Sequence, residues 1–588
     1  MKLLVLPPHR DVTLVPDAPQ GWHVVDVARD FCRRVLSDAA LTESIDDRVT
    51  GTATPQSMRE LLLLRSARTL LGRESRRGHA FDVGGTATSL LTANPSQSLA
   101  GQPPSGRDGV DDHTRLRAIG AVLTAISGPP NGIRLRLDDL ELEDGTTERS
   151  ADVLRALGQP APFTEDLARA AERFTQAERV RLWLERDQQL PAAAWLARAC
   201  PQDVPLEVAG PFAAAHRKVL ARMPMFQRAE FIDDAAPLHW RVAPLLGEPR
   251  ADSLLWIPES LDLLVYAPPL PLDEHDALLF EETEPRDLRT LTTKQVLGAC
   301  TPDELKVFTR GGPWGGHVML GSLGHAEALI EGGCRVAVVG FCAVSGGRVM
   351  DPYGYWHNTH VLVQGAQRLR AAGVRLVAEW WVGAPGVDEA VLEETLSALA
   401  SEPLFDHVAG VRPFHWSLEH RGIERASMEP LPSPPDRDLA RSQPFEAPNT
   451  IPTSRLPEVL ANLSTRLMQR APLNPGRVAG ANLRGPTAFP HMMILTVDYS
   501  EHSPIRLDDD CALVQLPASL DGAPKPTWYA ANLRTGTVLA MDARLAPKLS
   551  TLDRPTQVSE VLGAVPEAQR QKLVNTLVAK TVLTRVHE

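Results

Sequence analysis

The chain has little cysteine, no basic cluster and no long hydrophobic run. Its six cysteines in 588 residues are scattered without a Cys-x-x-Cys pair, which argues against a disulfide framework and predicts a reducing, cytoplasmic location. A net charge of −12 argues against non-specific binding to nucleic acid. No apolar run approaches the roughly 20 residues of a membrane helix, so no membrane partner is expected. Pro7 and Pro8 interrupt the first apolar run too early for a signal peptide.

The clearest pattern lies between about residues 290 and 430. Apolar runs of strand length alternate there with amphipathic segments of helix length, which predicts an α/β fold with a parallel sheet and crossover helices. We expect strands at 305–309, 335–342 and 374–382, and helices at 323–331, 357–372 and 387–400.

Residues 1–285 are less regular and predict a separate α/β domain. Strands are expected at 2–6, 133–137, 254–257 and 261–266, helices at 57–71 and 164–186, and a long loop at about 81–112.

The segment Arg310-Gly-Gly-Pro-Trp-Gly-Gly-His-Val-Met319 is rich enough in glycine to predict a loop. It resembles the cluster loop of the radical S-adenosylmethionine (SAM) family, which follows the first barrel strand and commonly reads Arg-Gly-Cys-Pro-Trp-x-Cys-x-x-Cys. On that pattern the three cysteine positions fall on Gly312, Gly316 and Met319. The likeness covers residues 290–430 and implies a partial (β/α) barrel of radical SAM type.

The loop departs from the family pattern at the residues that would bind the cluster. A [4Fe–4S] cluster of this kind needs three protein thiolates, which two glycines and a methionine do not supply. The nearby Cys334 and Cys342 have no cluster spacing and fit buried apolar positions better. We therefore expect neither a [4Fe–4S] cluster nor reductive cleavage of SAM.

The resemblance leaves SAM binding open. Gly346 and Gly347 fall where the family's Gly-Gly-Glu contacts the SAM amino group, although Arg348 replaces the acid. The turn from Gly383 to Gly386 precedes a helix whose N–H groups could hold an anion. Tight turns explain both segments equally well. The candidate SAM contacts are Gly346, Gly347, Glu379, Gly383, Pro385 and Gly386.

Glu379 lies within an apolar strand, where a carboxylate needs a partner that either Arg412 or a ligand cation could supply. Histidines near the predicted strand ends are candidate metal ligands, although the spacing of two of them also fits a polar helix surface. These histidines are His317, His357, His360 and His415. Asp111-Asp-His-Thr-Arg-Leu116 begins like the Asp-x-His-x-x-Gly loop of cobalamin domains but lacks its glycine, and we do not expect cobalamin.

Residues 431–489 read as a proline-rich linker followed by a helix at 455–470. The last region, 490–588, predicts strands, a hairpin and three short helices, as in a winged-helix α+β domain. The strands are expected at 493–497 and 512–516, the hairpin at 528–541 with its turn at 534–536, and the helices at 543–549, 557–562 and 566–580.

The hairpin Tyr529-Ala-Ala-Asn-Leu-Arg-Thr-Gly-Thr-Val-Leu-Ala-Met-Asp542 resembles the recognition elements of ribosomally synthesised and modified peptide (RiPP) pathways. The resemblance implies that a leader peptide adds a strand to the hairpin edge and lies against the last helix. The candidate peptide contacts are Tyr529, Asn532, Thr537 and Leu573.

Together these features suggest a radical SAM-like protein without cluster ligands that acts in RiPP biosynthesis. It would bind the leader of a precursor peptide and act as a scaffold for a catalytic partner, such as an intact radical SAM enzyme. One alternative is a non-radical enzyme that uses SAM or a histidine-bound metal in the barrel to modify a peptide. Another is a winged-helix regulator.

Overall fold

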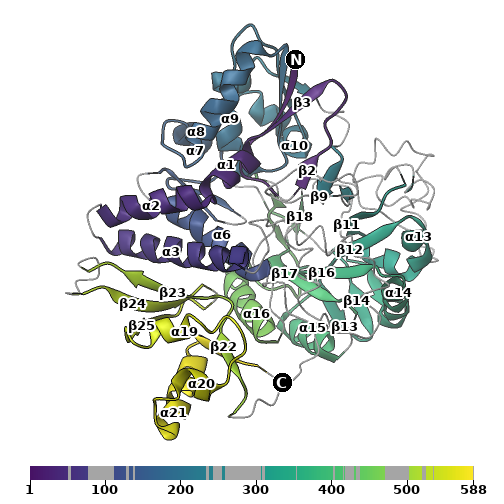
Figure 1. The fold of residues 1–588 in the computed structure, drawn as a ribbon. Helices are drawn as coiled ribbons and strands as arrows, with labels where there is room; N and C mark the ends of the chain where they lie inside the picture. Colours follow the sequence, from purple (N-terminus) through teal and green to yellow (C-terminus); the bar gives the residue numbers. More distant parts are fainter. Residues whose placement is uncertain are drawn as a thin grey trace. The chain divides into compact units, whose positions relative to one another are not determined.

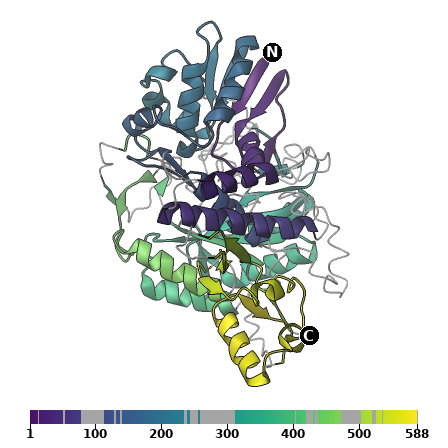
Figure 2. The same cartoon turned by 60° about the vertical axis from the view of Figure 1, so that its left-hand side comes forward.

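The computed structural model forms two compact units (Figures 1 and 2). The first contains the described residues of 1–31 and 138–494, and the second those of 32–82, 106–137 and 495–588. The structure describes residues 1–12, 14–50, 54–76, 112–127, 131–136, 139–232, 238–242, 255–257, 306, 311–352, 354–401, 404–414, 416–417, 429–431, 437–440, 442–470, 502–518, 525–533 and 535–586.

The first unit contains a five-stranded parallel sheet of order β3-β1-β6-β7-β8. Counting only these strands along the chain, the order is 2-1-3-4-5, that of flavodoxin-like doubly wound sheets. Its strands are β1 (Lys2–Leu6), β3 (Trp22–Asp26), β6 (Arg179–Trp183), β7 (Leu206–Ala209) and β8 (Glu230–Ile232). Its helices are α1 (Val27–Val35), α7 (Ser150–Ala156), α8 (Thr164–Glu172), α9 (Leu190–Ala199) and α10 (Pro211–Leu220).

The expected strand at 2–6 is confirmed, but the expected helix at 164–186 is wrong beyond Glu172. Helix α8 ends there, and Arg179–Trp183 is the inner strand β6. Buried Val180 and Leu182 alternate with half-buried Arg179 and Arg181, the period of a strand and not of a helix.

The first unit also contains a seven-stranded sheet of order β17-β16-β12-β11-β10-β9-β2. From β10 to β17 neighbouring strands of this sheet are parallel, and this part forms a curled half-barrel. At one edge β9 pairs antiparallel with β10 and with β2. The strands are β2 (Leu14–Pro16), β9 (Trp240–Val242), β10 (Leu255–Ile257), β11 (Trp314–Val318), β12 (Cys334–Phe341), β16 (Arg375–Val382) and β17 (His407–Pro413). The connecting helices are η6 (Leu320–His325), α13 (Ala326–Glu331), α14 (Thr359–Ala371) and α15 (Glu389–Ser401).

Two apolar clusters cover the two faces of the half-barrel. On one face Ala337 and Ala378 pack with residues of α13, α14 and α15. On the other, Val336, Val338 and Val377 pack with the five-stranded sheet through residues such as Leu4. The sheet is therefore buried on both faces, which explains the near-continuous apolar runs of β12 and β16.

The expected strands at 335–342 and 374–382 and the helix at 387–400 are confirmed as β12, β16 and α15. The loop expected from Arg310 to Met319 is wrong in its central part, because Trp314–Val318 forms β11, an inner strand. The expected helix at 357–372 begins at Thr359, after a three-stranded meander that the sequence did not suggest. The meander strands are β13 (Ala343–Ser345), β14 (Arg348–Met350) and β15 (Trp356–Asn358).

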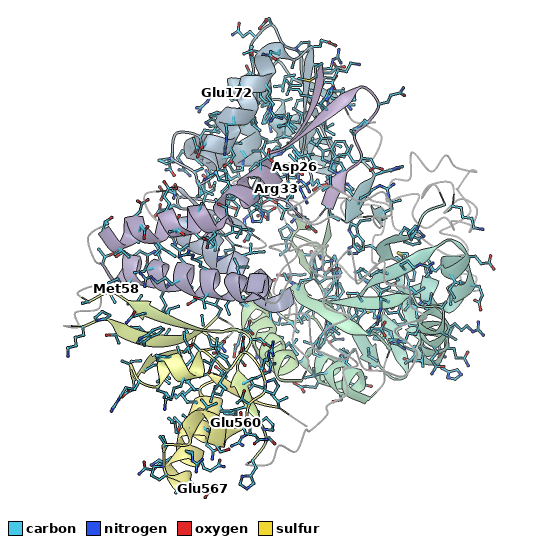
Figure 3. The ribbon with its side chains drawn as sticks, viewed as in Figure 1. Asp26, Arg33, Met58, Glu172, Glu560 and Glu567 are labelled. Carbon is cyan, nitrogen blue, oxygen red and sulfur yellow. The ribbon has the colours of Figure 1, made fainter. Side chains whose placement is uncertain are left out.

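The second unit combines distant segments of the chain. The antiparallel sheet β23-β24-β25 packs on one face against helices α19, α20 and α21, and α3 packs against β23. Figure 3 marks Met58 on α3, and Glu560 and Glu567 on α20 and α21. The elements are α2 (Asp38–Thr50), α3 (Pro55–Arg76), α6 (Asp112–Ile126), β4 (Ile133–Leu135), β22 (Ile505–Leu507), β23 (Cys511–Leu516), β24 (Thr527–Asn532), β25 (Val538–Met541), α19 (Ala546–Leu549), α20 (Val558–Leu562), α21 (Glu567–Ala579) and β26 (Leu583–Arg585).

The hairpin and the three C-terminal helices are confirmed within a few residues, whereas the pairing of β22 with β26 was not expected. The two units also cut across the expected domain bounds, since helices from the N-terminal region belong with the C-terminal strands. The expected helix at 455–470 is confirmed as α16 (Leu456–Arg470). The expected strands at 261–266 and 493–497, and that at 305–309 except Lys306, lie outside the described residues. The remaining elements are β5 (Leu140–Leu142), β18 (Trp416–Ser417), β19 (Glu429–Pro430), β20 (Ser442–Gln443), β21 (Phe445–Glu446), η1 (Arg173–Gln176), η2 (Asp187–Gln189) and η3 (Pro224–Phe226).

No helix in the described part of the chain is both long and apolar enough to span a membrane. In the segment compared with the cobalamin loop, Asp112 to Leu116 lie at the start of α6, so His113 is helical, while Asp111 lies outside the described residues.

Candidate functional site

Three polar side chains lie on the half-barrel face that turns away from its helices. On β16, Glu379 lies two residues after Val377, so the two side chains share a face. On β11, His317 is next to Val318, which packs on the opposite face with the helices. The guanidinium of Arg412, on β17, donates to Glu379 Oε2 at 2.5 Å. His317 Nδ1 lies 4.0 Å from the same oxygen. This set, His317, Glu379 and Arg412, is called the inner-face triad below.

Arg412, one of the two partners that the sequence suggested for an interior Glu379, forms an ion pair with it. Glu379 and His317 are only 8% and 7% exposed, and the Arg412 guanidinium also lies over the Trp381 ring at 3.9 Å. A buried carboxylate that is neutralised in this way makes a poor cation ligand. The triad therefore combines one buried ion pair with an imidazole whose Nδ1 lies 4.0 Å from the same carboxylate oxygen.

The other candidate metal histidines are not brought to this triad. His357 Nε2 lies 2.9 Å from the buried Asp351 carboxylate, and His360 contacts the Gln364 amide on α14. His415 lies outside the described residues. Within the described ranges, no group of three His, Cys, Asp or Glu side chains could hold a metal ion.

The three positions compared with cluster cysteines are spread along β11. Gly312 precedes the strand, Gly316 lies within it and Met319 follows it. At about 3.3 Å per residue the five residues of β11 span roughly 13 Å, and Gly312 and Met319 lie beyond its opposite ends. These positions do not converge on one point.

Gly346 and Gly347 form the turn between β13 and β14, where both have positive φ angles of 56° and 71°. Such a two-residue turn requires that conformation, which glycine adopts without steric cost. The Glu394 carboxylate accepts hydrogen bonds from the Ser345 hydroxyl and the Gly346 N–H, and these two bonds lower the pKa of Glu394. The turn thus has a structural explanation that needs no SAM.

The turn from Gly383 to Gly386 is also filled by the chain itself. Leu456 of α16 lies against Gly383, and the Gly386 N–H donates to the Thr450 hydroxyl. Helix α15 begins only at Glu389, and the Asp388 carboxylate accepts the Val391 N–H in its first turn. These contacts occupy two of the N–H groups that an anion would use, and they fit the alternative of a tight strand-to-helix connection around Pro385.

The four candidate peptide-contact residues occupy different positions in the structure. The Asn532 amide donates to the Asp508 carboxylate at 2.9 Å and to the Thr581 carbonyl at 2.8 Å. The Thr537 carbonyl accepts the Asn532 N–H at 2.9 Å in the same hairpin turn. Tyr529 is half-buried on the sheet face opposite the C-terminal helices, whereas Leu573 of α21 packs against the core on the helix side. Asn532 and Thr537 therefore hold the turn, and Tyr529 and Leu573 do not share a face.

Replacing Asn532 with alanine is expected to lower the free energy of unfolding by about 2 kcal/mol, because buried hydrogen-bonding groups lose their partner. Urea unfolding of the full chain measures this change. The exposed Lys572→Ala is the control and should change the stability by less than about 0.5 kcal/mol. If Asn532 were instead a peptide contact, Asn532→Ala would leave stability unchanged.

Strand β25 is the edge of its sheet. It pairs with β24 on one side, and in the described chain no strand pairs with its other side. Val538 is 52% exposed, and Ala540 is exposed on the same face. The sequence analysis did not single out these two residues. The signal was available, because the last strand of a hairpin is an edge unless another segment covers it.

No protein-family model matches the chain, and no curated protein matches it. Two solved structures of the radical S-adenosylmethionine methyltransferase TsrM from Kitasatospora setae are similar to it at 11% identity. The structure with tryptophan substrate and a SAM analogue bound has a TM-score of 0.27 and covers 55% of this chain and 85% of that chain. The structure with cobalamin and a [4Fe–4S] cluster bound has a TM-score of 0.24 and covers 46% and 72%.

The chain is an α/β protein whose curled half-barrel distantly resembles the radical SAM fold. A likeness with TM-scores of 0.27 and 0.24 carries no further conclusion.

Proposed function

We propose that this protein binds an extended peptide, the leader of a RiPP precursor, at the free edge of β25. The protein then serves as a scaffold that presents the precursor to a separate modifying enzyme. The observation that carries the proposal is the exposed edge of β25 in a hairpin that resembles the RiPP recognition elements. An unpaired edge offers main-chain donors and acceptors that an extended peptide can satisfy.

A scaffold role for the half-barrel follows from its side chains. Gly312, Gly316 and Met319 supply no thiolate and do not converge. The glycine turns compared with SAM-binding segments are held by the chain's own groups, including Glu394 and Thr450. The chemical step is therefore assigned to a partner, such as an intact radical SAM enzyme.

The test uses an array of labelled 15-residue peptides that tile the short reading frames beside the gene. Fluorescence anisotropy with the full chain should find at least one peptide that binds at micromolar concentration. Duplex DNA from the promoter of the same gene cluster should bind at least about tenfold more weakly at 150 mM salt.

Two results would contradict this function. Binding of no peptide at 100 µM would exclude peptide recognition of useful affinity. Tighter binding of the promoter duplex than of every peptide would instead support the winged-helix regulator. Co-purification with any radical SAM enzyme encoded beside the gene tests the scaffold role separately.

A further inference from the structure

A short segment of the proline-rich linker, residues 437–440, docks on the loop of residues 147–150 in the first unit. This segment is called the strap below. The Asp438 carboxylate accepts the Ser150 N–H at 2.8 Å and the Ser150 hydroxyl at 2.6 Å. Hydrogen bonds to an ionised acceptor are roughly twice as strong as bonds between neutral groups. Asp438 is therefore the main polar attachment of the strap to the loop.

The residues on either side of Asp438 add an apolar anchor and a cation. The Leu439 side chain is fully buried, and its N–H donates to the Glu148 carbonyl at 2.9 Å. The Arg437 guanidinium lies 3.3 Å from the Glu148 carboxylate, with the two side chains 57% and 31% exposed. An ion pair this exposed contributes little to stability. The strap thus presents a cation, an anion and an aliphatic side chain at consecutive positions.

The surface under the strap is more acidic than the strap neutralises. The Thr147 hydroxyl donates to the Asp187 carboxylate, so η2 lies beside the loop. Burial raises the pKa of Glu148 and the Asp187 charge raises it further, whereas Arg437 lowers it. The net rise means that one guanidinium does not compensate for burial and for the neighbouring acid. Residues 147–150 and η2, called the strap site below, therefore favour a basic segment.

We propose that the strap is a displaceable occupant of the strap site, and that its opening frees this site for a partner protein segment of the same chemistry. That segment carries a basic, an acidic and an aliphatic side chain in succession, as in Arg437-Asp438-Leu439. A strap with a purely structural role would open only when the whole unit unfolds. The inference concerns the first unit and does not depend on peptide binding at β25, which belongs to the second.

Hydrogen–deuterium exchange of the full chain tests whether the strap opens by itself. The Leu439 amide should exchange at least about 100-fold faster than the amides of β6. Asp438→Ala removes both Ser150 contacts and should speed exchange at Leu439 about tenfold or more, with β6 unchanged. Asp203→Ala removes the same charge from an exposed position of the first unit and should leave exchange at Leu439 unchanged.

A synthetic peptide of residues 433–443 tests binding from outside the chain. It should bind the Asp438→Ala chain, whose strap site is freed, with a Kd of about 100 µM or lower. The wild type should bind it at least about tenfold more weakly, because its own strap competes at high effective concentration. The same peptide with both Asp438 and Leu439 replaced by alanine should show no binding at about 1 mM.

Three results would overturn the inference. The first is a Leu439 amide that exchanges as slowly as the amides of β6, because the strap then opens only with the unit. The second is absence of peptide binding to the Asp438→Ala chain, and the third is equal binding to that chain and to the wild type. Circular dichroism and the thermal midpoint verify that the variant folds, and exchange in the wild type decides the question if it does not.

Discussion

Replacing Arg412 with methionine is expected to lower the free energy of unfolding by about 3 kcal/mol, because it leaves a buried carboxylate without its countercharge. Glu379 is 8% exposed, and the Arg412 guanidinium is its closest cationic partner in the inner-face triad. Methionine keeps an unbranched apolar stem against Trp381, so the lost charge accounts for most of the effect.

Two further variants isolate the charge. The double variant Arg412→Met with Glu379→Gln should recover most of the loss, since replacing both members of a buried ion pair is often nearly neutral. Arg368 forms an ion pair with Glu327 in which both side chains are about 60% exposed. Arg368→Met should therefore cost less than about 1 kcal/mol. Urea unfolding measures all three, and an Arg412→Met variant as stable as Arg368→Met would refute the assigned role.

Replacing Gly365 with alanine is also expected to have a large effect on the stability of the chain. Gly365 lies on α14 where the helix packs against η6, and a β-carbon at this position would lie 1.7 Å from the Leu323 carbonyl oxygen. On an exposed helix, alanine would be more stable than glycine by about 1 kcal/mol. The backbone clash should reverse that sign and destabilise the chain by about 3 kcal/mol.

Gln367→Ala on the exposed side of α14 is the matched control and should change stability by less than about 0.5 kcal/mol. Thermal unfolding followed by circular dichroism compares the two variants. A Gly365→Ala variant with a raised midpoint would mean that α14 does not pack on η6 as closely as observed.

The parts of the fold that the sequence predicted well are those with strong local patterns. The apolar runs of β12 and β16, each bounded by turns, indicated buried parallel strands, and both are inner strands. The hairpin of β24 and β25 was predicted from its turn, where Gly536 has a positive φ of 68°.

The failures have a common physical cause, namely that tertiary pairing overrides local composition. Gly315 and Gly316 have weak strand propensity, yet they lie in β11 because β10 and β12 pair with it on both sides. Helix α3 packs against β23 although more than 400 residues separate them. No local pattern in either segment indicates such a contact.

At the candidate sites, the sequence predicted that a buried acid needs a partner better than it predicted where the other site residues lie. An acid in an apolar strand implied a partner, and Arg412 is that partner for Glu379. The motif glycines near the half-barrel are instead explained by turns. At the hairpin, the turn sequence predicted the two strands, but only the register shows that Val538 and Ala540 face away from β24.

Hydrogen–deuterium exchange of the full chain, with and without the strongest-binding peptide from the array, tests the central claim most directly. The account predicts slower exchange in β25, at the amides of Val538 and Ala540, and unchanged exchange in β11, β12 and β16 of the half-barrel. Protection confined to the half-barrel strands, with β25 unchanged, would contradict it.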